Sequence, residues 1–384
     1  MRITSVETFP ISDRQLLVKI STDAGIAGWG EPTLETWTRP VAATVEQMAE
    51  YLIGKDPRQI NRHWQVLTRG GFYRGGPVMG SAVAGLDQAM WDLLGKSLGA
   101  PVHELLGGAV RDAIRLYAHA NTDDRLGDPA RAAALLRDGW TMVKLVPYLS
   151  AAPLETPGFT ERLVSDLREL RTVVGAEVDL AVDLHGRLSL AQSRRFLDAT
   201  ADLGLVFVEE PLRPEHTGLV GRLTSATATP IALGERLYSR AEFLPALTAG
   251  VTVVQPDVSH AGGISEAVRI AAMSEPFDAL LAPHCPLGIV AFAACVQVDA
   301  VAPNFLAQEC IVSFDGANPD TDLSFLLNPD EWMPRDGYLP LPTRPGLGLE
   351  IDEAAVRDAA RHDRTDPGVR LWWSDPRDQG YREW

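Results

Sequence analysis

From about Ala113 onward, short β-type runs alternate with helical segments, and this rhythm constrains the fold more than any other feature of the 384-residue chain. The β-type runs are 114–118, 142–146, 178–183, 205–209, 230–233, 251–255, 280–282 and 305–308. Helical segments lie between most of them, at 129–138, 161–174, 189–201, 218–226, 240–249, 264–274 and 290–301. Eight strands with a helix after most of them predict an α/β fold, a (β/α)8-type (TIM-like) barrel over residues 113–320. A doubly wound sheet is the alternative, although residues 118–123 lack the Gly-rich turn that such a sheet carries after its first strand.

The regions before and after the predicted barrel have different patterns. Residues 1–112 contain three β-type runs, at 2–10, 15–21 and 26–31, and then three helical segments, at 41–52, 57–68 and 81–98. This order predicts an N-terminal α+β domain. Residues 321–384 are predicted to be a C-terminal arm laid over the body, because the end of the chain is rich in Arg, Asp and Pro with late tryptophans.

Composition narrows the possible partners and compartments. The chain has 35 Lys and Arg against 51 Asp and Glu, and its formal charge of −16 argues against nucleic acid, because phosphate binding needs clustered basic side chains. No apolar run approaches the roughly 20 residues of a membrane helix, and the N-terminus lacks the apolar stretch of a signal peptide. Three cysteines without a CxxC pair are typical of a reducing compartment. We therefore predict a cytoplasmic protein with no nucleic-acid and no membrane partner.

Ionisable side chains follow seven consecutive β-type runs, at the point where each strand ends. They are Lys144, Asp183 with His185, Glu209, Glu235, Asp257, His284 and Glu309. The active site of a barrel lies at the carboxyl ends of its strands, so we expect these side chains to converge on one site.

Three of these side chains are carboxylates at the ends of adjacent strands: Asp183, Glu209 and Glu235. Side by side they would repel one another, and a hard cation removes that cost. Oxygen ligands of this kind suit Mg²⁺, so the sequence predicts a magnesium site, with pairing of each carboxylate to a helix-end arginine as the alternative. Glu210 competes with Glu209, because side chains alternate along a strand and only one of the two can face inward.

Two histidines flank the predicted metal site. His185 lies two residues after Asp183, and therefore on the same face if the segment is extended, whereas His284 lies across the ring. One histidine could remove a proton while the other donates one, and Asp257 could orient His284 through a hydrogen bond. For His260 a loop contact and a chemical role are both open. The remaining histidines are interpreted as polar residues at the edge of the core: His63, His103, His119, His216 and His362.

Several short motifs resemble those of the enolase superfamily, mandelate racemase subgroup, and within it those of the D-galactonate dehydratases. The motifs are FYRGG at 72–76, DLHGR at 183–187, EEP at 209–211, GER at 234–236, QPDVSHAGG at 255–263 and APHCPLG at 282–288. The similarity covers nearly the whole chain, from GWGEP at 28–32 to the last residues.

The resemblance implies a role for each of these residues. Residues 1–112, together with the C-terminal segment, would form a capping domain that closes over the barrel. The Mg²⁺ ligands would be Asp183, Glu209 and Glu235. His284, oriented by Asp257, would be the base that removes the proton next to the substrate carboxylate. His185 would be the acid that helps the β-hydroxyl leave, and it would contact the substrate together with Glu309. The family also implies a homo-oligomer.

The implied reaction is the dehydration of an acid sugar, with D-galactonate as the leading substrate. Loss of the C2 proton leaves an enediolate that Mg²⁺ and Glu309 stabilise, and loss of the 3-hydroxyl gives a 2-keto-3-deoxy acid. An epimerase or racemase, a dehydratase of another acid sugar, and a catalytically silent metal-binding barrel are the alternatives. Strand two ends Lys144-Leu145-Val146, where the galactonate dehydratases carry Lys-x-Asn, and the loop 147–159 also departs from the family. Lys144 could bind the substrate carboxylate or act as a structural cation, whereas Val146 can provide neither acid–base chemistry nor polar recognition.

Overall fold

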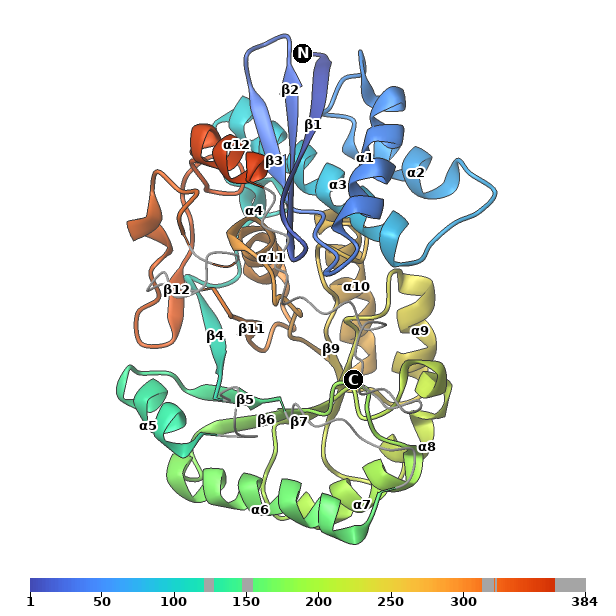
Figure 1. Cartoon of the computed structure of the whole chain (residues 1–384), viewed down its shortest axis with the longest axis vertical. Coiled ribbons are helices and arrows are strands. Elements are labelled where there is room, and N and C mark those ends of the chain that lie inside the picture. Colours follow the sequence, from blue (N-terminus) through green and yellow to red (C-terminus); the bar gives the residue numbers. More distant parts are fainter. Residues whose placement is uncertain (121–127, 147–154, 313–320, 322, 363–384) are drawn as a thin grey trace.

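The computed structural model describes residues 1–120, 128–146, 155–312, 321 and 323–362. An antiparallel sheet with its helices forms the upper part in Figure 1, and parallel strands with helices around them form the lower part. The predicted α/β barrel with an N-terminal α+β region is confirmed. The exact boundaries at residues 112 and 320 stay predictions.

The N-terminal region is a three-stranded sheet packed against helices. Strands β1 (Ile3–Ser12), β2 (Gln15–Thr22) and β3 (Ala27–Gly30) pair in sequence order, and helices α1 (Thr38–Leu52), α2 (Ile60–Arg69), α3 (Pro77–Leu98) and α4 (Val102–Leu105) follow. Glycines determine how closely α3 approaches the sheet. A Cβ at Gly28 would lie 2.0 Å from the carbonyl oxygen of Ala89, and a Cβ at Gly30 would lie 2.1 Å from that of Gly85. The glycines of the GWGEP motif are therefore required by close backbone packing.

Eight parallel strands form the barrel. They are β4 (Ala113–His119), β5 (Met142–Leu145), β6 (Asp179–Asp183), β7 (Phe207–Glu209), β8 (Ile231–Leu233), β9 (Val253–Val254), β10 (Leu280–Leu281) and β11 (Gln308–Glu309). Their order is β10-β9-β8-β7-β6-β5-β4-β11, and a parallel bridge between Leu281 and Phe305 joins the two ends. One apolar side chain from each strand or its flank fills the interior: Tyr117, Met142, Ala181, Phe207, Ala232, Val253, Ala282 and Ala307. A filled interior leaves the strand ends as the place for a site.

The helices that follow the strands agree with the predicted segments at most positions. They are α5 (Pro129–Arg137), α6 (Pro157–Val174), α7 (Leu190–Thr200), α8 (Gly221–Thr224), α9 (Arg240–Thr248), α10 (Ile264–Ser274) and α11 (Ile289–Val301). The single helix predicted over 218–226 is wrong, because the chain forms a 3-10 segment, η1 (Pro214–Leu219), and then the short α8. Gly218 and Gly221 explain the break, since glycine lowers helix stability by about 1 kcal/mol relative to alanine.

The chain after the barrel returns to the N-terminal region. Strand β12 (Tyr338–Pro340) pairs antiparallel with β4, and helix α12 (Glu353–Arg361) lies beside the β1–β3 sheet (Figure 1). The Nζ atom of Lys19 is 2.7 Å from Glu353 Oε2. The predicted arm beyond residue 362 lies outside the described residues. In the part of the chain that the structure describes, no helix has both the length and the apolar surface to cross a bilayer.

Two buried carboxylates of the N-terminal region cap helices of the barrel. Glu31 accepts the backbone N–H groups of Gly288 and Ala291, each at 2.9 Å, at the start of α11. Asp87 on α3 accepts the N–H and the O–H of Ser265, at 2.9 and 2.6 Å, at the start of α10. The first N–H groups of a helix have no partner inside the helix and favour a negative charge. The N-terminal region therefore docks by supplying caps that two barrel helices lack.

Burial makes Glu31 a source of pH-dependent stability. Burial raises the pKa of Glu31 from 4.5 to about 7. The folded chain therefore holds more protons than the unfolded chain between these pH values, so the contribution of Glu31 to stability is full below about pH 4.5 and is lost as the pH rises through 7. We expect Glu31→Gln, which cannot titrate, to flatten the decline of the unfolding midpoint across this pH range, as measured by circular dichroism. The exposed Glu50→Gln is the control and should keep the wild-type profile; an unchanged slope in Glu31→Gln would exclude the buried carboxyl as its source.

Candidate active site

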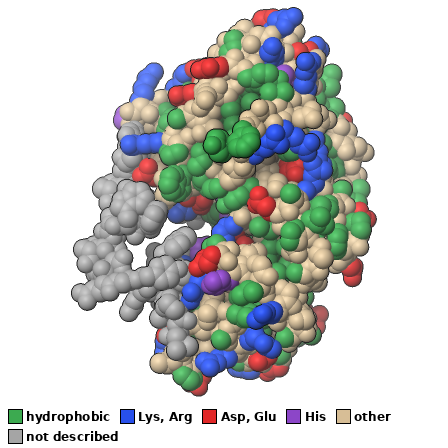
Figure 2. Space-filling model, turned by 90° about the vertical axis from the view of Figure 1, so that its right-hand side faces the viewer, with side chains coloured by type: hydrophobic (Ala, Val, Ile, Leu, Met, Phe, Trp, Pro, Cys, Tyr) green, Lys and Arg blue, Asp and Glu red, His purple; other side chains and the backbone are tan. Residues whose placement is uncertain are grey.

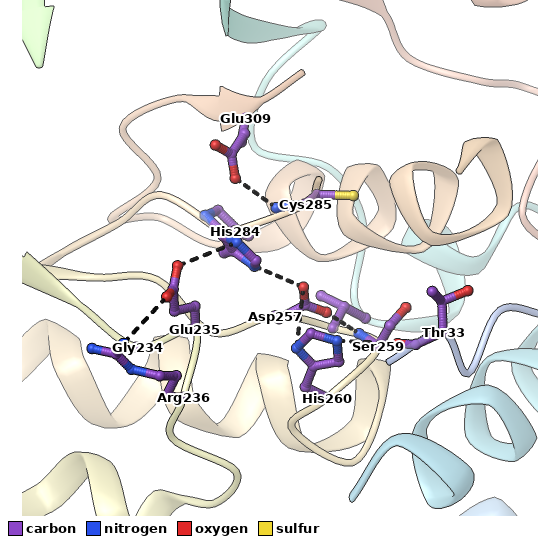
Figure 3. Close-up of polar contacts among 12 residues, drawn as sticks. Thr33, Gly234, Glu235, Arg236, Asp257, Ser259, His260, His284, Cys285 and Glu309 are labelled. Atoms are coloured by element: carbon purple, nitrogen blue, oxygen red, sulfur yellow. Dashed lines mark hydrogen bonds and ion pairs between the residues drawn. The ribbon is translucent and has the colours of Figure 1, made fainter. Parts of the chain in front are cut away.

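The ionisable side chains that follow the barrel strands meet at the end of the barrel that faces the N-terminal region. Figure 2 shows basic, acidic and histidine side chains gathered where the upper and lower parts of the molecule meet. In the close-up of Figure 3, Glu235, Asp257, His284 and Glu309 lie around one centre. These residues come from the ends of four different strands, as the barrel rule predicts.

Lys144 lies among three carboxylates. Its Nζ atom is 3.0 Å from Glu209 Oε2 and 3.9 Å from Asp183 Oδ2, and it also pairs with Glu309 Oε1. The side chain is 1% exposed, and the ring of Tyr117 lies 5.4 Å from the ammonium group. Burial alone would lower the pKa of Lys144, but Glu209 and Glu309 hold it well above its usual value. Lys144 is therefore a permanent cation in this group of carboxylates.

The three predicted metal ligands have more negative charge than Lys144 can balance. Asp183 and Glu209 are paired neighbours in the β6–β7 register, and Glu235 follows β8. Burial raises the pKa of all three carboxyls, that of Glu209 to about 7. Among the described residues, the buried Glu209 Oε1 has no hydrogen-bond partner. One oxygen each of Asp183 and Glu235 and one ring nitrogen of His185 lie within 4.8 Å of one another. This group is two carboxylates and one imidazole, a set that can hold a divalent cation, and it does not include Glu209, which pairs with Lys144.

Glu209 and Glu210 point to different partners, as alternation along the strand predicts. Glu209 pairs with Lys144, whereas Glu210 pairs with Arg236, which follows β8. Glu210 has a φ of 39°, so the chain turns sharply at the end of β7. Gly186 has a φ of 67°, which favours glycine, and a Cβ there would lie 2.4 Å from Arg236 Nη1, so the guanidinium would have to shift.

His185 does not lie in an extended segment, so the prediction that alternation puts it on the same face as Asp183 is wrong. Strand β6 ends at Asp183, and His185 has a φ of 54°, which is the left-handed region and not an extended strand. The turn is held by the His185 N–H, which donates to Asp183 Oδ1 at 2.7 Å. Burial and then the nearby Arg187 lower the pKa of His185 to about 3. The imidazole is therefore neutral in the free protein.

His284 and Asp257 form the hydrogen bond that the sequence analysis expected. His284 Nδ1 lies 2.8 Å from Asp257 Oδ2, and its Nε2 lies 3.3 Å from Glu235 Oε2 (Figure 3). Burial would lower the pKa of His284, but Glu235 and the hydrogen bond to Asp257 raise it well above its usual value. Nδ1 is thus hydrogen-bonded to Asp257, and Nε2 faces the carboxylate of Glu235.

A second group with metal-ligand spacing consists of Asp257, His260 and His284. Direct contacts account for this group: His284 Nδ1 lies 2.8 Å from Asp257 Oδ2, and His260 Nδ1 lies 3.5 Å from the same oxygen. The His260 Nε2 atom lies 3.0 Å from the carbonyl oxygen of Thr33. His260 therefore belongs to the edge of the site and joins it to the N-terminal region.

His119 ends the first barrel strand and lies in the site, although it is not among the predicted site residues. His119 Nε2 lies 2.8 Å from Glu309 Oε1, while Glu309 Oε2 accepts the backbone N–H of Cys285 at 2.9 Å. The same rule of strand ends that selected the other residues would have found His119, because β4 ends there.

Val146 is buried, and the part of its loop at 147–154 lies outside the described residues.

The other histidines take structural positions. His63 contacts the Tyr51 hydroxyl and the Asp56 carbonyl oxygen, and His103 contacts Gln297. His216 lies in η1, and His362 follows α12 at the surface.

A closed parallel barrel, an α+β region docked on it, and carboxylates with histidines at the strand ends define a capped-barrel enzyme. Two family profiles match the chain: the mandelate racemase/muconate lactonizing enzyme N-terminal domain at residues 3–107 and the enolase C-terminal domain-like family at residues 128–355. The chain belongs to the mandelate racemase subgroup of the enolase superfamily.

Relatives are similar over almost the full length. A D-galactonate dehydratase of Ralstonia nicotianae is 42% identical over 362 residues, 94% of this chain and 95% of that protein. A D-galactonate dehydratase of Variovorax paradoxus is 42% identical over 363 residues, with the same coverage. Among solved structures, an enolase from Agrobacterium radiobacter with bound Na and L-malate is 32% identical, with a TM-score of 0.85, and the match covers 93% of this chain and 95% of that one.

Proposed function

We propose that this protein is a Mg²⁺-dependent hydro-lyase that dehydrates an acid sugar, with D-galactonate as the leading substrate and 2-keto-3-deoxygalactonate as the product. The observation that carries the proposal is the position of two histidines beside one carboxylate group. His284 Nε2 lies 3.3 Å from Glu235, and a ring nitrogen of His185 lies within 4.8 Å of the same side chain. The D-galactonate dehydratases at 42% identity support the same reaction. We place the enzyme in the cytoplasm as a homo-oligomer.

Asp183, Glu209 and Glu235 would hold the magnesium ion. When bound, the ion supplies positive charge where negative charge develops on the substrate carboxylate. Two observations on the protein support this assignment: burial raises the pKa of these carboxyls, and Glu209 Oε1 has no hydrogen-bond partner among the described residues.

His284 acts as the base through its Nε2 atom. Because Nδ1 donates its hydrogen to Asp257, the lone pair of the neutral ring lies on Nε2 and can accept the C2 proton. Asp257 then stabilises the imidazolium that forms. The raised pKa keeps the ring protonated while Glu235 is charged, so His284 would be a base only once the charge of Glu235, the group that raises this pKa most, is neutralised.

His185 acts as the acid for the leaving 3-hydroxyl group. Arg187 Nη2 lies 3.2 Å from His185 Nδ1 and donates to it, so the ring hydrogen is on Nε2. The arriving substrate carboxylate adds a negative charge, which raises the lowered pKa of this histidine. Lys144 and Glu309 lie between the metal ligands and His119, and we propose that both contact the substrate.

The end of β5 argues against an epimerase. A second base at this position would need a titratable group facing the substrate, and here Val146 is apolar while Lys144 is engaged by three carboxylates. Dehydration uses the two histidines that are in place.

A screen of acid sugars tests the reaction directly. The protein with Mg²⁺ should convert D-galactonate to a 2-keto-3-deoxy acid, detected as its semicarbazone, and treatment with a chelator should abolish the product. A library of other aldonates and aldarates tests the departures at Val146 and in its loop. No product from any acid sugar would refute the dehydratase proposal, and C2 deuterium uptake without a keto product would assign an epimerase.

Neighbouring glutamates give a matched test of the metal site. Glu209→Gln and Glu210→Gln remove the same charge, but only Glu209 is a proposed ligand. Mn²⁺ binding measured by calorimetry should weaken at least about tenfold in Glu209→Gln, as expected when a group around a metal is lost, and much less in Glu210→Gln. Equal losses in the two variants would contradict the assignment.

A further inference from the structure

The loop after β9 carries Asp257 and is covered by the N-terminal region. Trp64 on α2 donates its Nε1–H to the carbonyl oxygen of Gly262 at 2.8 Å. Gln88 on α3 donates to Ser259 Oγ at 3.1 Å. The position of the loop is thus determined by helices that lie outside the barrel.

Within this loop, His260 contacts both the N-terminal region and Asp257. The side chain is 6% exposed, and its Nε2 lies 3.0 Å from the carbonyl oxygen of Thr33 (Figure 3). A carbonyl oxygen can only accept, so Nε2 carries the hydrogen and donates it. The other ring nitrogen, Nδ1, lies 3.5 Å from Asp257 Oδ2, and this contact is attractive when Nδ1 also carries a hydrogen and the ring is an imidazolium.

Thr33 is a fixed anchor for this contact. It is fully buried, its hydroxyl oxygen accepts the Leu16 N–H at 3.0 Å, and its hydroxyl hydrogen can be donated to Glu31 Oε1 at 3.2 Å. Glu31 itself caps helix α11 of the barrel. The carbonyl that holds His260 is therefore tied to both parts of the molecule.

The Asp257 carboxylate is enclosed by three contacts. Oδ1 accepts the Ser259 N–H at 2.7 Å, and Oδ2 accepts the His284 Nδ1–H at 2.8 Å with His260 on its other side. The rings of His260 and His284 lie 6.3 Å apart across this carboxylate. We propose that His260 is a positioning residue, through which the N-terminal region fixes Asp257 and hence the direction in which His284 Nε2 points. The effect of His260 on catalysis rests on the proposed function, whereas its effect on the positions of Asp257 and His284 does not.

Two substitutions each keep a polar group at one end of the His260 ring and remove the other end, and the proposed role needs both ends. His260→Gln can still donate to Thr33 from a position near that of Nε2, whereas His260→Asn keeps a polar group near that of Nδ1. We expect each variant to lower kcat for the acid sugar by about tenfold to a hundredfold, as small misplacements of a reacting group do. KM should change little, because His260 acts through Asp257 and His284.

The downfield proton resonance of the His284 Nδ1–H gives a readout without substrate. It should shift or broaden in both His260 variants and disappear in His284→Asn, which identifies it. His63→Gln is the matched control, because His63 is also buried and also contacts a backbone carbonyl, but its partners are Tyr51 and Asp56 of the N-terminal region. This control should keep both kcat and the resonance.

The outcomes distinguish the inference from the proposed function. A folded His260 variant with unchanged resonance and unchanged kcat refutes the positioning role, even if its melting temperature falls. A large rise in KM with constant kcat also refutes it, since that pattern indicates a substrate contact. If no acid sugar reacts with the wild-type protein, the proposed function fails, and the resonance still decides whether His260 positions the pair.

Discussion

At the carboxyl end of the barrel, several buried carboxylates surround a single buried lysine, and the other features of the site follow from this imbalance of charge. Lys144 is a buried cation that Asp183, Glu209 and Glu309 share. Burial raises the pKa of the Asp183 and Glu209 carboxyls, so charge on these groups is costly unless a further cation compensates it. Part of the negative charge in a chain with a formal charge of −16 is therefore compensated locally by Lys144 at this end of the barrel.

The N-terminal region is part of the site as well as a cover. Within three residues, Glu31 caps α11 and the Thr33 carbonyl oxygen accepts a hydrogen bond from His260. Asp87 caps α10, the helix that follows the Asp257 loop. The loop that orients His284 is thus held between the two parts of the molecule, and its geometry depends on how they dock.

Much of the fold and site could be predicted from the sequence because both follow simple periodicities. The alternation of strands and helices predicted the barrel, and the rule of strand ends selected Lys144, Asp183 and Glu309. The positions of the remaining site residues depend on the three-dimensional path of the backbone, which these periodicities do not specify. His185 reaches the site through a left-handed turn that alternation cannot predict, and His260 contacts a backbone carbonyl oxygen 227 residues away in the chain. β12 and α12 are short segments whose positions depend on contacts with β4 and with the N-terminal sheet.

Deuterium exchange at C2 of the acid sugar separates the two histidines most directly. His284→Asn should abolish both exchange and dehydration, because the base is lost. His185→Asn should lose dehydration but retain exchange, because the C2 proton is still removed when the hydroxyl cannot leave. Retained exchange in His284→Asn would show that another group is the base, and loss of exchange in His185→Asn would place His185 in metal binding or folding instead of acid catalysis.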